Sequence, residues 1–296
     1  MSFEFKEKKS RAGGTLMILL SALAFCCMSV FVALTDESIG VFEQSFFRNL
    51  IALIVFGGIA WRDHVPMVTA KKYWLPLFGR SLFGYLGVLC LFYASRHAAQ
   101  SDVAILIRLS MFTISICGVV FLKEKLTKMH IPALLLAFLG AYIAADPSFD
   151  SSLLPTLAAL GNALCCTVAY SLLAYFSGRV HPLTVVVHFC LFSTIASVPL
   201  MWADFVLPTG IDLFYVLMIG VCAAIGQISV TMAYRMAPAS EVSVYDQAGI
   251  LFSAGLGYVF LHQIPGKNTV LGGLLVIAAS VMLYTYNRRH QQAPGT

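Results

Sequence analysis

The chain carries one phrase twice, RHAAQSDVAILIRLSMFT at residues 96–113 and RMAPASEVSVYDQAGILF at residues 235–252. Arg, Ala, Ser, an acidic residue and Val recur in the same order, and Arg96 matches Arg235 at an offset of 139 positions. The same offset pairs other groups without a gap, namely FCC at 25–27 with LCC at 164–166, Gly87 with Gly226, Gly118 with Gly257, and VFL at 120–122 with VFL at 259–261. Shared apolar bias explains any single match but not the set, so we interpret residues 1–147 and 148–296 as two copies of one unit.

The composition is that of an integral membrane protein. Hydrophobic residues make up 59% of the chain and charged residues only 11%, whereas about a quarter of a typical soluble domain is charged. A spanning helix needs about 20 mainly apolar residues, and lipid leaves only closed backbone structures such as helices. The sequence predicts an all-α protein with about ten transmembrane helices, at residues 14–34, 39–60, 74–94, 102–122, 131–146, 154–177, 184–203, 211–234, 240–261 and 269–287.

Five helices in each copy is an odd number, and this decides how the copies are related. The second copy must enter the membrane from the opposite side, so the two units are predicted to be inverted repeats. Inverted repeats recur in secondary transporters, where the substrate site lies near the middle of the membrane between the repeats.

The formal net charge of +5 follows from topology and does not require a nucleic-acid partner. With the N-terminus in the cytoplasm, the far-side loops hold only Arg96 and Lys267. The cytoplasmic side then holds Lys6, Lys8, Lys9, Arg11, Arg62, Lys71, Lys72, Lys123, Lys125, Lys128, Arg179, Arg235, Arg288 and Arg289. This positive-inside pattern predicts that both termini are cytoplasmic.

The eight cysteines all fall within predicted helices, so we expect small packing residues and no disulfide framework. No Cys/His spacing suggests a zinc site. We expect no metal and no cofactor.

The chain resembles the drug/metabolite transporter superfamily, in the group built from two EamA domains. The resemblance is carried by LFYASRHAAQSDVAIL and VVFLKEKLTKMHIPALLLAFLGAYIA in the first half, and by AYRMAPASEVSVYDQAGILFSAGLGYVFLHQIPGKNTVLGGLLVIAASVML in the second. Family members typically end the fourth helix in Leu-Gly-Glu. Here Lys123 replaces the Gly before Glu124, His262 and Gln263 replace Gly-Glu in the second copy, and Met111 stands where many relatives have Pro. The resemblance implies a ten-helix transporter and says little about its substrate.

Charges within the predicted helices are candidate site residues, because ionisable groups at mid-membrane are costly and usually face a cavity or the bundle interior. Arg48 lies in the second predicted helix, with Glu43 and Gln44 about one turn away as expected partners. Arg80 opens the buried part of the third predicted helix. For both arginines a structural role is the alternative to substrate binding.

Arg108 and its 139-offset counterpart Gln247 come towards mid-membrane from opposite sides, and Gln247 follows Tyr245 and Asp246. In similar transporters the third, fourth, eighth and ninth helices line the central cavity, so the resemblance implies that these residues meet there. The alternative is an ion pair that only holds the halves in register. Further polar residues could add hydrogen bonds or simply pack between helices, namely Asn162, Tyr170, His188 and Gln227. The acids near helix starts, Asp102 and Glu241, are expected to act as caps.

The predicted function is transport of a small organic metabolite by alternating access in the cell (inner) membrane. Three arginines against few acids favour an anionic or zwitterionic, amino-acid-like substrate. The alternatives are an intramembrane enzyme, for which no constellation such as His-Glu-x-x-His is found, a channel, and a broad-specificity drug exporter of the same fold. The expected partners are the small-molecule substrate and membrane lipid, with no nucleic acid, and the bundle could also form a homodimer.

Overall fold

The computed structural model describes residues 11–110, 112–113, 129–145, 153–176, 179–202, 205–236 and 245–291. Helices and irregular segments account for all of this part of the chain, which contains no strand. The elements are α1 (Arg11–Leu34), α2 (Val41–Arg62), the 3₁₀ turn η1 (Lys71–Tyr73), α3 (Trp74–His97), α4 (Gln100–Ile107), α6 (His130–Ala145), α7 (Leu153–Phe176), α8 (Pro182–Met201), α9 (Gly210–Met236), α11 (Ala248–Leu261) and α12 (Lys267–Gln291).

The prediction of an all-α integral membrane protein is confirmed. Among the described residues, seven helices are long and apolar enough to cross a membrane, and two shorter apolar helices accompany them at Ile131–Ala144 and Ala248–Leu261. Each of the ten predicted stretches contains a described helix. The predicted stretches at 102–122 and 240–261 extend partly beyond the described residues. Gly118, Glu124 and Glu241 lie outside the described residues.

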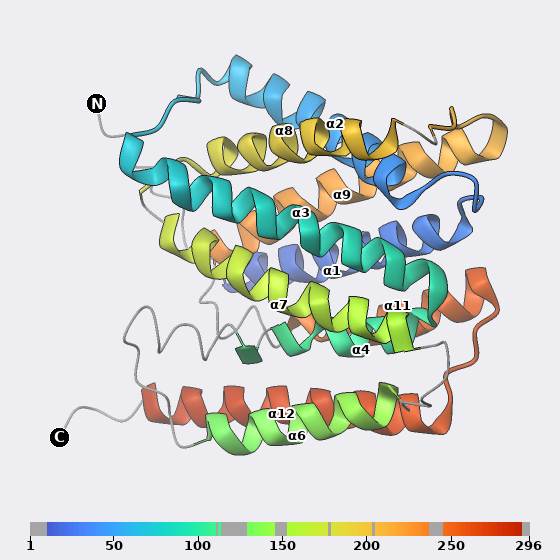
Figure 1. Ribbon diagram of the computed structural model, residues 1–296. Coiled ribbons are helices and arrows are strands. Elements are labelled where there is room, and N and C mark those ends of the chain that lie inside the picture. The colour runs from blue at the N-terminus through green and yellow to red at the C-terminus, as the bar shows by residue number, and fades with distance from the viewer. Residues whose placement is uncertain are drawn as a thin grey trace.

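The helices pair across the two halves of the sequence (Figure 1). α1 packs along α9, and α3 packs along α7. α6 and α12 lie side by side at one edge of the bundle, while α2 and α8 lie together at the opposite edge. α4 packs against α11 between the α6–α12 pair and the central helices. Each of these helices therefore packs mainly against helices from the other half of the sequence.

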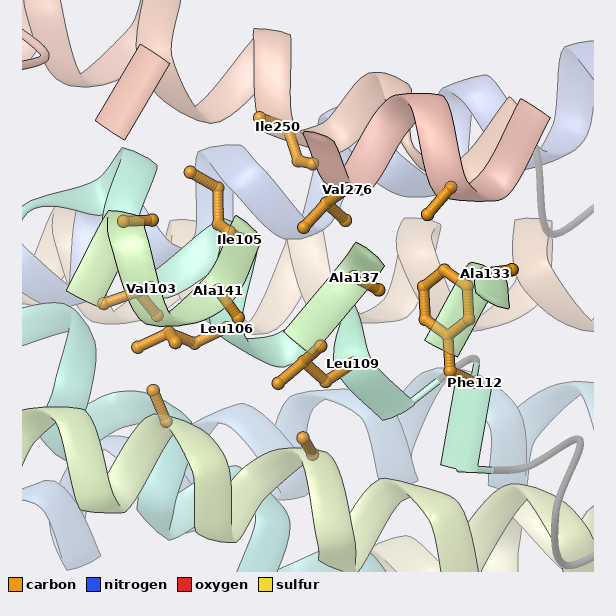
Figure 2. Close-up of a cluster of buried hydrophobic side chains, with 14 of the residues drawn as sticks. Val103, Ile105, Leu106, Leu109, Phe112, Ala133, Ala137, Ala141, Ile250 and Val276 are labelled. Atoms are coloured by element: carbon orange, nitrogen blue, oxygen red, sulfur yellow. The ribbon is translucent and has the colours of Figure 1, made fainter. Parts of the chain in front are cut away.

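The largest buried cluster joins α4, α6, α7, α11 and α12, and Figure 2 shows its side chains. α6 contributes only small residues to it, Ala133, Ala137, Ala141 and Ala144. A Cβ on Gly140 would lie 2.7 Å from the carbonyl oxygen of Gly272, so the α6 and α12 backbones nearly touch there. Because lipid is as apolar as a leucine side chain, such close backbone approach is what drives helices together in a membrane.

Asp102 lies in the first turn of α4, where a carboxylate is favoured by the helix dipole. The N-cap position itself is taken by Ala99. The Asp102 carboxylate also accepts a hydrogen bond of 2.7 Å from the Thr269 hydroxyl. Asp102 therefore ties the start of α4 to the start of α12.

Candidate functional site

The central feature is an ion pair between the two halves of the chain. Arg108 Nη1 donates a hydrogen bond to Asp246 Oδ2 and forms a salt bridge with it. The Arg108 side chain is 14% exposed and the Asp246 side chain 32% exposed. The structure thus brings together two charged residues that are 138 positions apart. Of the two residues that flank Asp246, Gln247 is buried and Tyr245 is 40% exposed.

α4 ends and α11 begins at the residues next to or within this ion pair. Arg108 is the C-cap of α4 and Gln247 is the N-cap of α11, with ψ angles of −13° and −18°. The Ile250 N–H donates to the Gln247 carbonyl over 3.0 Å, which is the i to i+3 spacing of a 3₁₀ turn. Arg108 and Gln247 are counterparts under the 139-residue offset. The two related helices are therefore interrupted at the same place, beside the ion pair.

A glycine makes room for Arg108. A Cβ on Gly249 would overlap the Arg108 guanidinium, which supplies the three nearest atoms, Nη2, Cζ and Nε. The Cys26 thiol of α1 donates to the Gly249 carbonyl over 3.3 Å. Arg108 Nε is buried and has no hydrogen-bond partner. The guanidinium is thus held between Asp246 and a bare helix backbone.

Arg48 and Arg80 lie apart from the ion pair, on the ring of Phe189 in α8. The Arg48 and Arg80 Cζ atoms are 5.5 Å and 4.7 Å from the ring centroid. Each arginine is 4% exposed. Arg48 Nη1 donates to Asn49 Oδ1 over 2.7 Å, whereas Arg80 Nε and Nη1 are buried without a hydrogen-bond partner.

The prediction that Glu43 and Gln44 partner Arg48 is wrong. Glu43 is the third residue of α2, and its carboxylate accepts a hydrogen bond from the N–H of the N-cap residue Gly40, as the acidic residue of a capping box does. The other carboxylate oxygen of Glu43 accepts from the Val206 N–H over 2.5 Å. Gln44 donates to the Val32 carbonyl. The Glu43 carboxylate is therefore engaged by backbone N–H groups and does not pair with Arg48.

Two aromatic residues, Tyr170 and Phe189, accompany these charged side chains, and neither could be singled out from the sequence. Tyr170, in α7, interacts electrostatically with Arg80, Arg108 and Asp246 and with Arg48. Tyr170 is thus close enough to the ion pair and to the two arginines on Phe189 to interact electrostatically with both. Tyr170 was one of several polar helix residues in the sequence, and Phe189 one of 22 phenylalanines, so no pattern distinguished them.

Two other polar candidates serve helix contacts. Asn162 Nδ2 donates to the Gly87 carbonyl over 2.7 Å, and His188 Nε2 lies 2.8 Å from the Met67 carbonyl. His188 also lines a pocket of about 310 Å³ with Met67, Val68, Thr69, Trp74, Leu77, Phe78, Ser81 and Phe192. None of the proposed charged or neighbouring site residues lines this pocket, so the pocket is separate from them; these residues are Arg48, Arg80, Arg108, Tyr245, Asp246 and Gln247.

The described residues contain no group of three or more His, Cys, Asp or Glu side chains that could hold a metal ion.

Comparison with known proteins gives two matches to one family along this chain. The family model of the EamA-like transporter family matches residues 12–145 and again residues 153–285. The chain belongs to the EamA-like transporter family. It is therefore a small-molecule transporter of the drug/metabolite superfamily and not an enzyme.

Relatives of this chain are named as transporters or solute carriers. The pseudopaline exporter CntI of Pseudomonas aeruginosa is 30% identical over 91% of this chain and 95% of its own length. The riboflavin transporter of Rhizobium johnstonii is 26% identical over 95% and 94%. Mouse solute carrier family 35 member G1 is 23% identical over 94% and 80%. A solved structure titled "Crystal structure of protein" matches with a TM-score of 0.71 at 19% identity, over 96% of this chain and all of that one.

The place of Gly249 beneath Arg108 gives a stability prediction. In Gly249→Ala the new methyl group meets only the end of a flexible side chain, so the cost is that of moving the guanidinium off Asp246, about 1–3 kcal/mol. The apparent melting temperature of the purified protein should fall. Gly255→Ala is the matched control in the same helix, because a Cβ there meets nothing within 4 Å.

In an Arg108→Ala background the Gly249→Ala change should cost much less, because the displaced group is gone. Equal destabilisation by Gly249→Ala with and without Arg108 would show that the methyl group disturbs something else.

Proposed function

We propose that this protein moves a small anionic or zwitterionic, amino-acid-like metabolite across the membrane by alternating access. The observation that carries the proposal is the Arg108–Asp246 ion pair, which joins the two halves of the chain at a partly buried position. The substrate site would include Arg48, Arg80, Arg108, Tyr245, Asp246 and Gln247.

The proposal takes residues 1–147 and 148–296 as inverted repeats. Helix pairing supports this, because α1 with α9 and α7 with α3 are equivalent pairs when each element is exchanged for its counterpart. α2 with α8, and α6 with α12, are pairs of counterparts. Two related units give two similar arrangements, each open to one side, from one set of contacts.

The ion pair suggests what the substrate offers. A guanidinium binds a carboxylate through two parallel hydrogen bonds, and a carboxylate accepts hydrogen bonds from an ammonium group. A zwitterion could therefore replace each partner of the Arg108–Asp246 pair with one of its own charged ends. Substitution of this kind lets the halves separate without leaving a bare buried charge, which costs several kcal/mol per ion.

The names of relatives are consistent with an organic metabolite as substrate, since the P. aeruginosa relative is a pseudopaline exporter and the R. johnstonii relative is a riboflavin transporter. One is named an exporter, so export is one direction for the family; the charge cluster itself sets no direction.

The orientation is proposed from the distribution of Lys and Arg. Both termini would be cytoplasmic in the cell (inner) membrane, and the 146–153 loop would lie outside. In a variant without native cysteines, Asp150→Cys should react with an impermeant thiol reagent in intact cells and Lys128→Cys should not. The reverse pattern would contradict the orientation.

Removal of either charge of the pair should stop transport. In proteoliposome counterflow with a panel of labelled amino acids, Arg108→Ala should lower the rate by at least about tenfold, as expected for a loss of 1.4 kcal/mol or more. Arg108→Lys should restore little, because an ammonium lacks the planar fork. Asp246→Asn should weaken substrate binding or trap one conformation.

The same assay run across a pH series separates two roles for Asp246. If the acid anchors substrate or latches the halves, the pH response should be nearly the same in the wild type and in Asp246→Asn. Wild-type transport driven by an imposed pH gradient, with that response lost in the variant, would instead make Asp246 a proton site. Normal counterflow by Arg108→Ala would give the pair a structural role only.

A further inference from the structure

We infer that Arg48, Arg80 and Phe189 form a second anion subsite, separate from the Arg108–Asp246 pair, so that the substrate has an acidic group besides its amino-acid-like end. The inference rests on the proposed transport function and deepens it. The ligand class is an amino acid with an additional carboxylate or phosphate group.

The subsite is built from three helices. α2 supplies Arg48, α3 supplies Arg80, and α8 supplies Phe189, which is 3% exposed. A Cβ on Gly84 would overlap the Arg80 guanidinium and the Phe189 ring. A glycine thus makes room for the Arg80 guanidinium between its own helix and the ring, as Gly249 of α11 makes room for Arg108.

No described carboxylate balances these two charges. The described groups that act electrostatically on Arg80 are Tyr170, Cys166 and Cys190. Those acting on Arg48 are Cys190, Tyr170 and Arg80 itself. The nearest acid in sequence, Glu43, is engaged by the N–H groups of Gly40 and Val206. Two guanidinium groups therefore share one buried site with a phenol and thiols around them.

The energetics disfavour a purely structural role. Burying an ion without a counter-charge is costly even after relaxation, and arginine cannot lose its proton in a protein. A cation over an aromatic ring and one hydrogen bond to a neutral group recover only part of that cost. Arg80 makes no hydrogen bond through Nε or Nη1. Two like charges on one ring also repel each other. An anion between them would supply both the missing charge and the missing acceptors.

The charge count distinguishes the two subsites. Arg108 and Asp246 balance each other and suit the ammonium and carboxylate of an amino acid. Arg48 and Arg80 add two unbalanced positive charges, which suit one further carboxylate or, better, a phosphate with charge near −2. Tyr170 interacts electrostatically with the charged groups of both subsites.

The test is equilibrium binding to the purified full-length protein, with L-alanine, L-glutamate and O-phospho-L-serine as probes. The wild type should bind both acidic probes at least about tenfold more tightly than alanine, a difference of about 1.4 kcal/mol. Arg80→Gln and Arg48→Gln should abolish this preference, because the affinity for the acidic probes should fall at least about tenfold more than the affinity for alanine. Whether glutamate or phosphoserine binds more tightly identifies the acidic group.

Arg62→Gln is the matched control, because this arginine ends the same helix as Arg48 with an 89% exposed side chain; it should leave the preference intact. Arg80→Lys keeps the charge without the fork and should give an intermediate preference, which guards against a misfolded glutamine variant. Equal binding of alanine and the acidic probes, or a preference that persists in both glutamine variants, would overturn the inference. Failure of the wild type to transport any labelled panel compound would instead count against the proposed function.

Discussion

A guanidinium and a carboxylate that meet inside a lipid-surrounded bundle constrain everything built around them. Neither Arg108 nor Asp246 can be left alone in that environment, because an unpaired buried charge costs several kcal/mol. The pair spans the two halves of the chain, so its partners must stay together or be replaced by charges from another molecule. This requirement connects the packing of the bundle to its function as a transporter.

The surrounding structure is adapted to bring these charges close. Gly249 leaves α11 bare where Arg108 lies, and Gly84 does the same in α3 for Arg80. α4 and α11 are interrupted at the counterpart positions Arg108 and Gln247. Away from the charges, small residues such as Gly140 and Gly272 let α6 and α12 pack backbone to backbone. Glycines thus allow both the close approach of the arginine side chains to helix backbones and the close packing of α6 against α12.

Much of the fold could be predicted because lipid imposes a simple rule: every span must be a long apolar helix. The resemblance to EamA transporters also implied that Arg108 and Asp246 meet, and they form an ion pair. The partners of Arg48 could not be predicted in this way. Glu43 was near enough in sequence, but its place at the start of α2 gave it a backbone N–H to cap.

Phe189 was missed, and Tyr170 was not distinguished from the other polar helix residues, for a different reason. In a soluble helix the buried face stands out because the other face is polar. In a membrane helix both faces are apolar, so periodicity does not show which residue of α7 or α8 points inwards. Contacts such as Arg80 with Phe189 depend on helix rotation, and only the three-dimensional packing reveals it.

The most direct test of the central ion pair is a charge exchange, with Arg108→Asp and Asp246→Arg made singly and together. The account predicts that each single change, which places two like charges side by side, lowers both the melting temperature and counterflow. The double change should recover stability, with a coupling free energy of about 1–3 kcal/mol. A double variant whose loss equals the sum of the two single losses would show that the two charges do not depend on each other, and would contradict the account.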